Sequence, residues 1–124
     1  MHNANRKVIG KLAENIADTY LQSQGLQSLE VNYYCKMGEI DLIMKDNDAY
    51  VFVEVRHRKE DDYGDGLESI TRSKQNKIIR TATHYLLEKK IFDRVDCRFD
   101  VISIGGNLHN PEILWIKDGF WVKY

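Results

Sequence analysis

Two apolar, β-prone segments joined by four polar residues constrain the fold more than any other part of the sequence. Residues 39–45 and 50–58 are rich in Val, Ile, Phe and Tyr, and the sequence DNDA lies between them at residues 46–49. Segments of this composition on either side of turn-forming residues are typical of an antiparallel hairpin. We therefore expect two paired strands in the middle of the chain.

A turn centred between residues 47 and 48 also fixes the register of this hairpin. It predicts four cross-strand pairs: Lys45 with Tyr50, Ile43 with Phe52, Asp41 with Glu54, and Glu39 with Arg56. Directly opposed side chains lie on one face of a sheet, so the carboxylates of Asp41 and Glu54 repel each other unless a cation lies between them. Hard divalent cations take carboxylate oxygens as ligands, and the pair is therefore a candidate metal site.

The alternative is that Asp41 and Glu54 are solvated residues on an outward face. Their neighbours Ile43 and Phe52 are apolar, which argues against that alternative. The opposite face is apolar too, and it comprises Ile40, Leu42, Met44, Val51, Val53 and Val55. A sheet that is apolar on both faces is usually covered on both sides, and charge at the rim of such a core is costly unless it is paired or bound to metal. Both interpretations stay open at this point.

Length and composition indicate one globular domain spanning residues 1–124. The chain is 43% hydrophobic and 30% charged with a single proline, and its net charge of −1 excludes a broadly basic surface. Cys35 and Cys97 form no CxxC pattern and are expected to be buried thiols in a reduced compartment. No segment has the ~20 apolar residues of a membrane span or the pattern of a signal peptide, so we expect a cytoplasmic protein.

Helical periodicity predicts a first helix over residues 5–24 that ends at Gly25. Its apolar stripe comprises Ile9, Leu12, Ala13, Ile16, Ala17 and Tyr20. Glu14 lies on the flank of this stripe. It is either a solvated helix residue, which is the commoner fate of Glu, or a third carboxylate that leans over the hairpin.

A second helix is expected from Ser69 or Thr71, either of which can cap it, to about residue 90. Its apolar stripe comprises Ile78, Ile79, Ala82, Tyr85 and Leu86. The first turns carry Arg72, Lys74, Lys77 and Arg80, with no acid between residues 69 and 87. Basic residues near a helix N-terminus gain nothing from the helix dipole, so this face is either simply solvated or is the contact for an anionic polymer. The polar loop before it, residues 59–69, is a candidate flap.

Further strands are expected at residues 26–35 and 98–104, with a turn at 105–107 and a last hairpin of residues 112–117 and 120–123 around Asp118-Gly119. Asp100 alternates with apolar residues, so it is either a structural hydrogen-bonding group or an orienter of the basic residues. This order of elements predicts an α/β fold with a mixed central β-sheet and a helix on either face. The third and fourth strands have the spacing of a right-handed crossover.

The spaced set of Glu14, GEIDLI at residues 38–43 and FVEVRHR at residues 52–58 resembles the PD-(D/E)XK nuclease superfamily. With GKLAEN, KQNKIIRTATHYL and RFDVISI, nearly the whole chain more closely resembles the bacterial YraN family, which is similar to Holliday-junction resolvases. The resemblance implies a restriction-endonuclease-like, three-layer α/β domain.

The resemblance also implies roles for individual residues. It places the two motif acids at Asp41 and Glu54, the first-helix Glu at Glu14, and the motif lysine at Arg56. Mg²⁺ or Mn²⁺ would be held by Asp41, Glu54 and the backbone carbonyl of Val55. The nucleic-acid contacts would be Arg58, Arg72, Lys74, Gln75, Lys77 and Arg80.

Arg56 departs from the superfamily pattern. Arginine is always charged and cannot act as a base, although it can stabilise charge on a phosphate through bidentate hydrogen bonds. The leading hypothesis is therefore a metal-dependent, structure-selective endonuclease for branched DNA, with a homodimer expected by analogy. The runner-up is a nucleic-acid-binding module without turnover. A protein–protein adaptor with an aromatic surface near Trp121 and Tyr124 is the third alternative.

Overall fold

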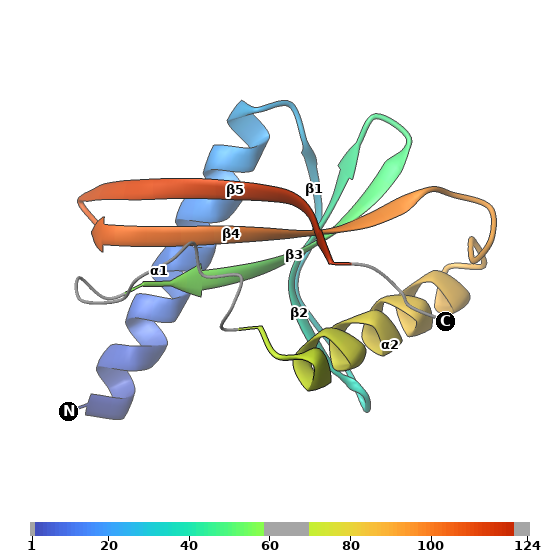
Figure 1. Cartoon of the computed structure of the whole chain (residues 1–124), viewed down its shortest axis with the longest axis horizontal. Helices are drawn as coiled ribbons and strands as arrows, with labels where there is room; N and C mark the ends of the chain where they lie inside the picture. Colours follow the sequence, from blue (N-terminus) through green and yellow to red (C-terminus); the bar gives the residue numbers. More distant parts are fainter. Residues whose placement is uncertain (1, 59–69, 121–124) are drawn as a thin grey trace.

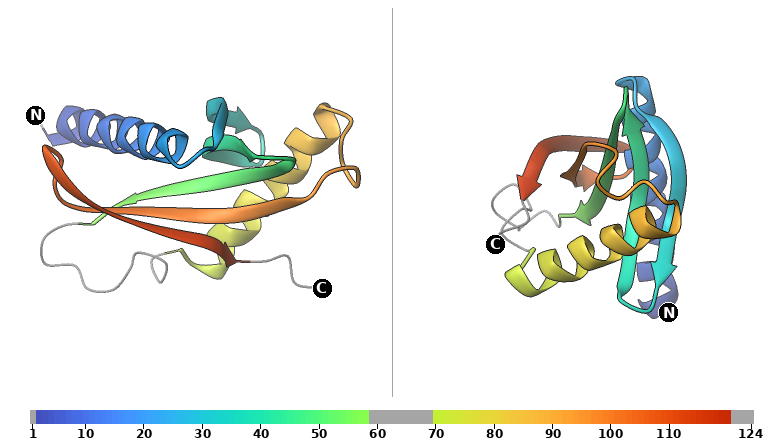
Figure 2. Two further views of the ribbon diagram at one scale, coloured as in Figure 1. Left: turned by 90° about the horizontal axis from the view of Figure 1, so that it is seen from above. Right: turned by 90° about the vertical axis from the view of Figure 1, so that its right-hand side faces the viewer.

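Apolar alternation on five strands builds a mixed sheet with one helix on each face (Figures 1 and 2). The computed structural model describes residues 2–58 and 70–120. The elements are α1 (His2–Ser23), β1 (Gln27–Cys35), β2 (Gly38–Asp46), β3 (Ala49–His57), α2 (Arg72–Glu88), β4 (Cys97–Asn107) and β5 (Asn110–Phe120). The strand order is β1-β2-β3-β4-β5, and only β3 and β4 run parallel, because α2 connects them.

Each helix covers its own apolar core. The core beneath α1 comprises Ala13, Ala17, Leu21, Leu26, Leu42, Met44, Val51, Val53, Ile102 and Ile104. The core beneath α2 comprises Tyr33, Ile40, Ile43, Phe52, Ile70, Ile78, Ala82, Tyr85, Leu86, Phe99, Val101 and Phe120. A sheet that is apolar on both faces needs this double cover, which confirms the mixed α/β architecture. None of the described helices is long and apolar enough to cross a membrane.

Most predicted elements are confirmed within a few residues, and Thr71 is the N-cap of α2, its side chain accepting the Lys74 amide. The predicted turn at residues 105–107 is wrong, because these residues belong to β4 and pair with β5. The predicted last hairpin is wrong too. Asp118 and Gly119 lie within the single strand β5, where Asp118 has φ 58° beside an irregularity in the pairing with β4. The predicted flap at residues 59–69 and the residues Trp121 and Tyr124 lie outside the described residues.

Three burial predictions also need correction. Ile9 and Leu12 are 38% and 45% exposed, because the N-terminal half of α1 lies toward the end of the sheet, whereas Ala13 and Ala17 are buried. Ile40 packs beneath α2 rather than with Leu42 beneath α1, so the strict alternation of β2 breaks there. Cys97, the first residue of β4, is exposed rather than buried.

Buried Asp100 is a structural group, as one of the two interpretations predicted. Its carboxylate accepts hydrogen bonds from Arg98 Nε (3.0 and 3.2 Å), Trp115 Nε1 (3.0 Å) and the amide of Asp118 (2.9 Å). Arg98 also pairs with Asp46 at 2.9 Å. This network ties β4 to β5 and to the end of the central hairpin, and it explains how β5 continues through the bulge at Asp118.

Candidate functional site

The candidate site forms where the sheet divides between β2 and β3. The two strands pair in the predicted register, with Lys45 opposite Tyr50 and Ile43 opposite Phe52, but the last pair of the ladder is Leu42 and Val53. Beyond this pair, β2 continues against β1 while β3 continues against β4 (Figure 1). The division leaves room for side chains from both strands between the two halves of the sheet.

Asp41 and Glu54 occupy the first positions beyond the last ladder pair. Instead of pairing through its backbone, Asp41 turns its carboxyl group to β3, where Oδ2 accepts the amide of Val55 at 2.8 Å. This hydrogen bond of ordinary length to the main chain of β3 fixes the position of the Asp41 carboxyl group. Val55 therefore contributes its N–H to this arrangement, and the carbonyl ligand role implied by the resemblance remains a prediction.

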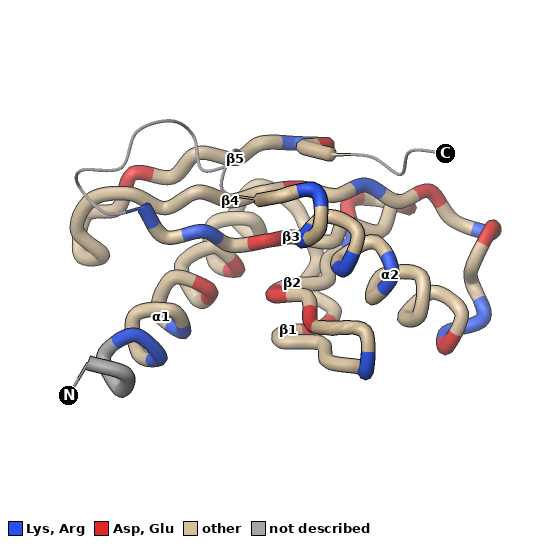
Figure 3. Tube along the Cα trace, turned by 60° about the horizontal axis from the view of Figure 1, so that its bottom comes forward, with Lys and Arg blue, Asp and Glu red and all other residues tan. Residues whose placement is uncertain are grey.

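A cavity of about 270 Å³ opens at this point. It is lined by Gly38, Glu39, Asp41, Glu54, Arg56, Lys74, Lys77 and Ile78. Strands β2 and β3 supply the acids, and the first turns of α2 supply the two lysines; Figure 3 shows these acidic and basic positions side by side. The structure thus brings together five of the residues that the sequence indicated, from three separate elements.

The pKa values of both acids are raised. Burial and then the charge of Glu54 raise the pKa of Asp41 to about 8, against the opposing effect of the Val55 amide. Burial also raises the pKa of Glu54, which is lowered in turn by a hydrogen bond from Asp41 and by the charges of Arg56 and Lys74. Because this hydrogen bond raises one pKa and lowers the other, the proton resides on Asp41, and the pair titrates as a unit.

Glu14 lies near this pair without lining the cavity. Its pKa is raised by burial and by the charge of Asp41, and lowered by a hydrogen bond from Asn32. Among the described residues, no three Asp, Glu, His or Cys side chains are placed to hold a metal ion together. The donor set is therefore two carboxylates, which fits Mg²⁺, since that ion is commonly held by one or two carboxylates with water and phosphate oxygens completing its shell.

The basic residues divide into two groups. Arg56, Lys74 and Lys77 line the cavity, and Nη1 of Arg56 lies 3.5 Å from Oε2 of Glu54. The predicted pairing of Arg56 with Glu39 is not made, because the β2–β3 ladder ends at Leu42 and Val53. Arg56 is therefore held beside the acid that would bind a metal.

The other four predicted nucleic-acid contacts do not line the cavity. Arg72 donates to the side chain of Gln75 (3.2 Å), and Gln75 donates to a carbonyl just before α2 (3.1 Å), so both belong to the start of the helix. Arg80 is exposed farther along α2. Arg58 follows β3, and its guanidinium lies against Gly105 of β4.

Three residues that line the cavity were not predicted as site residues: Gly38, Glu39 and Ile78. Glu39 alternates with Asp41 along β2, and this spacing is a signal that the sequence did contain. Gly38 has φ 147°, and a Cβ there would lie 3.3 Å from Oγ1 of Thr81. Glycine therefore lets β2 approach α2 closely, which places Lys77 of that helix over the cavity.

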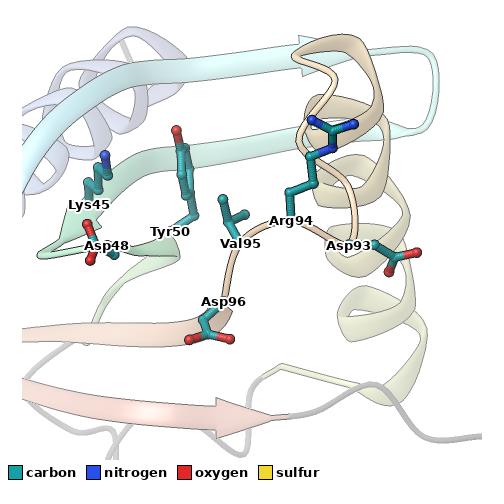
Figure 4. Close-up of a pocket in the computed structure, with 7 residues that line it drawn as sticks. All are labelled: Lys45, Asp48, Tyr50, Asp93, Arg94, Val95 and Asp96. Carbon is teal, nitrogen blue, oxygen red and sulfur yellow. The ribbon is translucent and has the colours of Figure 1, made fainter.

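A larger, open cavity of about 530 Å³ lies at the other end of the central hairpin, beside the β2–β3 turn (Figure 4). Its lining is mostly charged: Lys45, Asp48, Tyr50, Asp93, Arg94, Val95 and Asp96. In Figure 4, Asp93 and Asp96 point in different directions, away from Tyr50. The acids here do not converge, in contrast to Asp41 and Glu54.

Comparison with known sequences gives a consistent result. Residues 13–104 match the family described as "Uncharacterised protein family UPF0102". A UPF0102 protein of Nitrosococcus oceani is 42% identical over 123 residues, which is 99% of each chain. UPF0102 proteins of Psychromonas ingrahamii and Legionella pneumophila are 51% and 47% identical over 111 residues, covering 90% of this chain and 88% and 92% of theirs. This chain belongs to the UPF0102 family.

Proposed function

We propose that this protein is a metal-dependent endonuclease of the PD-(D/E)XK type, with a restriction-endonuclease-like fold, that acts on branched or otherwise structured DNA as Holliday-junction resolvases do. The observation that supports this most is the position of Asp41 and Glu54. The two carboxyl groups share one proton in a cavity bordered by Arg56, Lys74 and Lys77. The proposal also places the chain with the YraN-type proteins that its motifs resemble.

Asp41 and Glu54 would hold Mg²⁺ or Mn²⁺, with the carbonyl of Val55 as a further ligand. Such an ion supplies a nucleophile from bound water and offsets the charge of the phosphate. This donor set is supported chemically, because two partly buried carboxyl groups with raised pKa values would gain a partner of opposite charge when a cation replaces a proton between them. Glu14, close enough to affect Asp41, would orient water or a second ion.

The cationic residues would hold the substrate. Arg56 has the geometry to stabilise charge on the scissile phosphate, because it lies beside Glu54 and its guanidinium can bind two oxygens at once. Lys74 and Lys77 would position the neighbouring phosphates from α2. Arg58, Arg72, Gln75 and Arg80 would make contacts farther along the backbone, and a homodimer would present two cavities to a branched substrate.

A nucleic-acid-binding module without turnover is the second candidate. One observation favours it: Arg56 occupies the position where the resembled motif has lysine, and arginine cannot accept a proton. This candidate uses the same basic residues, so only a catalytic test separates the two functions.

The metal site is tested by thermal unfolding in increasing Mg²⁺ or Mn²⁺. We expect the wild type to gain stability and Asp41→Asn to gain none, because a ligand that binds only the folded state stabilises it by mass action. An exposed-carboxyl variant, Asp48→Asn, is the matched control and should respond as the wild type does. No metal-dependent shift in the wild type, with DNA present or absent, would contradict the metal site.

Catalysis is tested by incubating junction, flap and linear DNA with the wild type and with Glu54→Gln in Mg²⁺. Cleavage by the wild type alone supports the endonuclease, and DNA binding without cleavage by either supports the binding module. Lys77→Ala should weaken binding to all sequences and lower the salt dependence of the affinity, because it removes one phosphate contact. An unchanged salt slope would show that this face of α2 is only solvated.

A further inference from the structure

The turn between β1 and β2 presents large apolar side chains to solvent beside the cavity. Tyr34 is 76% exposed and Met37 is 42% exposed, and Lys36 between them is exposed too. We propose that this turn binds unpaired nucleotide bases through Tyr34, so that the substrate carries a single-stranded or flipped-out segment next to the bound phosphate. The inference rests on the proposed function and names the kind of nucleic acid that the site takes.

The position of Tyr34 follows from strand pairing. Tyr34 of β1 is directly opposite Glu39 of β2, and Glu39 lines the cavity with Asp41. Directly opposed residues of an antiparallel pair project from the same face with their Cβ atoms roughly 4.5–5.5 Å apart. The phenol ring of Tyr34 therefore starts next to Glu39, a residue that lines the cavity.

The exposure of Tyr34 contrasts with that of its neighbour. Tyr33, the adjacent residue, is buried beneath α2, where its hydroxyl contacts His84 (3.1 Å) and Glu88 (3.3 Å). Tyr34 lies on the opposite side of β1, where it covers little of the chain's own apolar surface. An exposed ring near a cavity that two lysines border is suited to stacking on a base, which every base permits because each has a flat π-face.

Charge supplies the second argument for a nucleic acid. Lys36 lies on the turn, while Lys74 and Lys77 border the cavity from α2. Figure 3 shows basic positions on this turn and on α2 beside the acidic positions of β2. A nucleic-acid strand that passes through the cavity would meet cations on both sides, and one of its bases would lie against Tyr34. This combination of aromatic and basic residues is typical of single-strand binding surfaces.

The test uses a flap DNA and a linear duplex, each with 2-aminopurine at the matching position, in EDTA so that no cleavage occurs. We expect Tyr34→Ala to weaken flap binding roughly tenfold and leave duplex binding within about twofold, and Tyr34→Phe to bind like the wild type. The 2-aminopurine fluorescence of the flap should be quenched by the wild type and not by Tyr34→Ala. Phe92→Ala, which removes an exposed aromatic ring beyond the far end of α2, is the matched control.

The outcomes separate this inference from the proposed function. If the wild type and Tyr34→Ala bind the flap equally, or if both DNAs lose affinity equally, base stacking by Tyr34 is wrong while nucleic-acid binding stands. If the wild type binds neither DNA, both proposals fail, and the exposed turn is better explained as a protein contact. Unfolding temperatures of all variants within a few degrees of the wild type would show that the losses are not caused by misfolding.

Discussion

Replacing Asp41 with Asn should stabilise the metal-free protein at neutral and alkaline pH. The neutral amide reproduces the protonated state of Asp41, because its oxygen can accept the Val55 amide and its NH₂ group can donate to Glu54. The wild type keeps one proton on this pair up to about pH 8, whereas an unfolded Asp loses it near 3.8. The variant has no proton to lose at this position.

The sign and size of the effect follow from proton linkage. Between pH 4 and pH 8 the folded wild type binds one more proton than the unfolded chain, so its free energy of unfolding falls by about 1.4 kcal/mol for each pH unit. Asp41→Asn lacks this slope. The stability of the variant relative to the wild type should therefore rise by about 3 kcal/mol from pH 5 to pH 7 and level off above pH 8.

Urea unfolding at pH 5, 6, 7 and 8 in EDTA measures this difference directly. Asp48→Asn, at the turn of the same hairpin, controls for the loss of one carboxyl group. Parallel pH profiles for the wild type and Asp41→Asn would refute the shared proton and the burial argument behind it. Millimolar Mg²⁺ should narrow the difference at pH 8, since only the wild type would bind it.

Three further predictions concern the elements that hold the site. Thr71→Ala should lower the stability by about 1 kcal/mol, because it removes the N-cap of α2, and urea unfolding against Thr71→Ser measures it. Asp100→Ala should lower the free energy of unfolding by about 3–5 kcal/mol, because it removes the partner of the partly buried Arg98. A large drop in the urea midpoint would measure this loss. Gly38→Ala should lower the free energy of unfolding by about 1 kcal/mol or more, because φ 147° and the contact with Thr81 both disfavour a Cβ. It should also weaken DNA binding by moving α2.

These predictions have distinct contrary results. An equal stability of the Ala and Ser variants at residue 71 would show that the cap does not contribute. A small loss for Asp100→Ala would mean that the Arg98 network is replaced by water. Normal stability and DNA binding of Gly38→Ala would show that the close approach of β2 to α2 does not position the lysines.

The fold was predictable where local pattern and tertiary structure agree. The hairpin register followed from its turn, because a one-residue shift would have moved its apolar residues to the wrong face. The prediction of a last hairpin was wrong because Asp118-Gly119 has the composition of a turn but forms a bulge. The carboxylate of Asp100, distant in sequence, stabilises this bulge. Likewise, the stripe of α1 is periodic through Ile9 and Leu12, but periodicity does not show how far the sheet extends beneath a helix.

The sequence predicted that Asp41 and Glu54 lie near each other, but it did not predict how the strands form the cavity. The sequence placed Asp41 opposite Glu54, yet the division of the sheet after Leu42 and Val53 comes from tertiary pairing: beyond this pair β2 keeps only β1 as its neighbour, and β3 keeps only β4. That division is what creates the cavity. Tyr34 illustrates the same limit, because its place next to Glu39 depends on the register of β1 against β2, which no local pattern predicted.

Asp41 and Asp100 lie in the same sheet but differ in how many hydrogen-bond donors surround their carboxyl groups. Asp100 is fully buried and accepts hydrogen bonds from one guanidinium, one indole and one backbone amide, so its lone pairs are occupied. Asp41 accepts one backbone amide and otherwise faces a second carboxyl group, so a proton has to fill the gap. In the proposed function, a divalent cation would take the place of this proton. A cation at Asp100 would instead have to displace the donors that tie β4 to β5. The proposal therefore assigns the metal to the acid that the fold supplies with fewer hydrogen-bond donors.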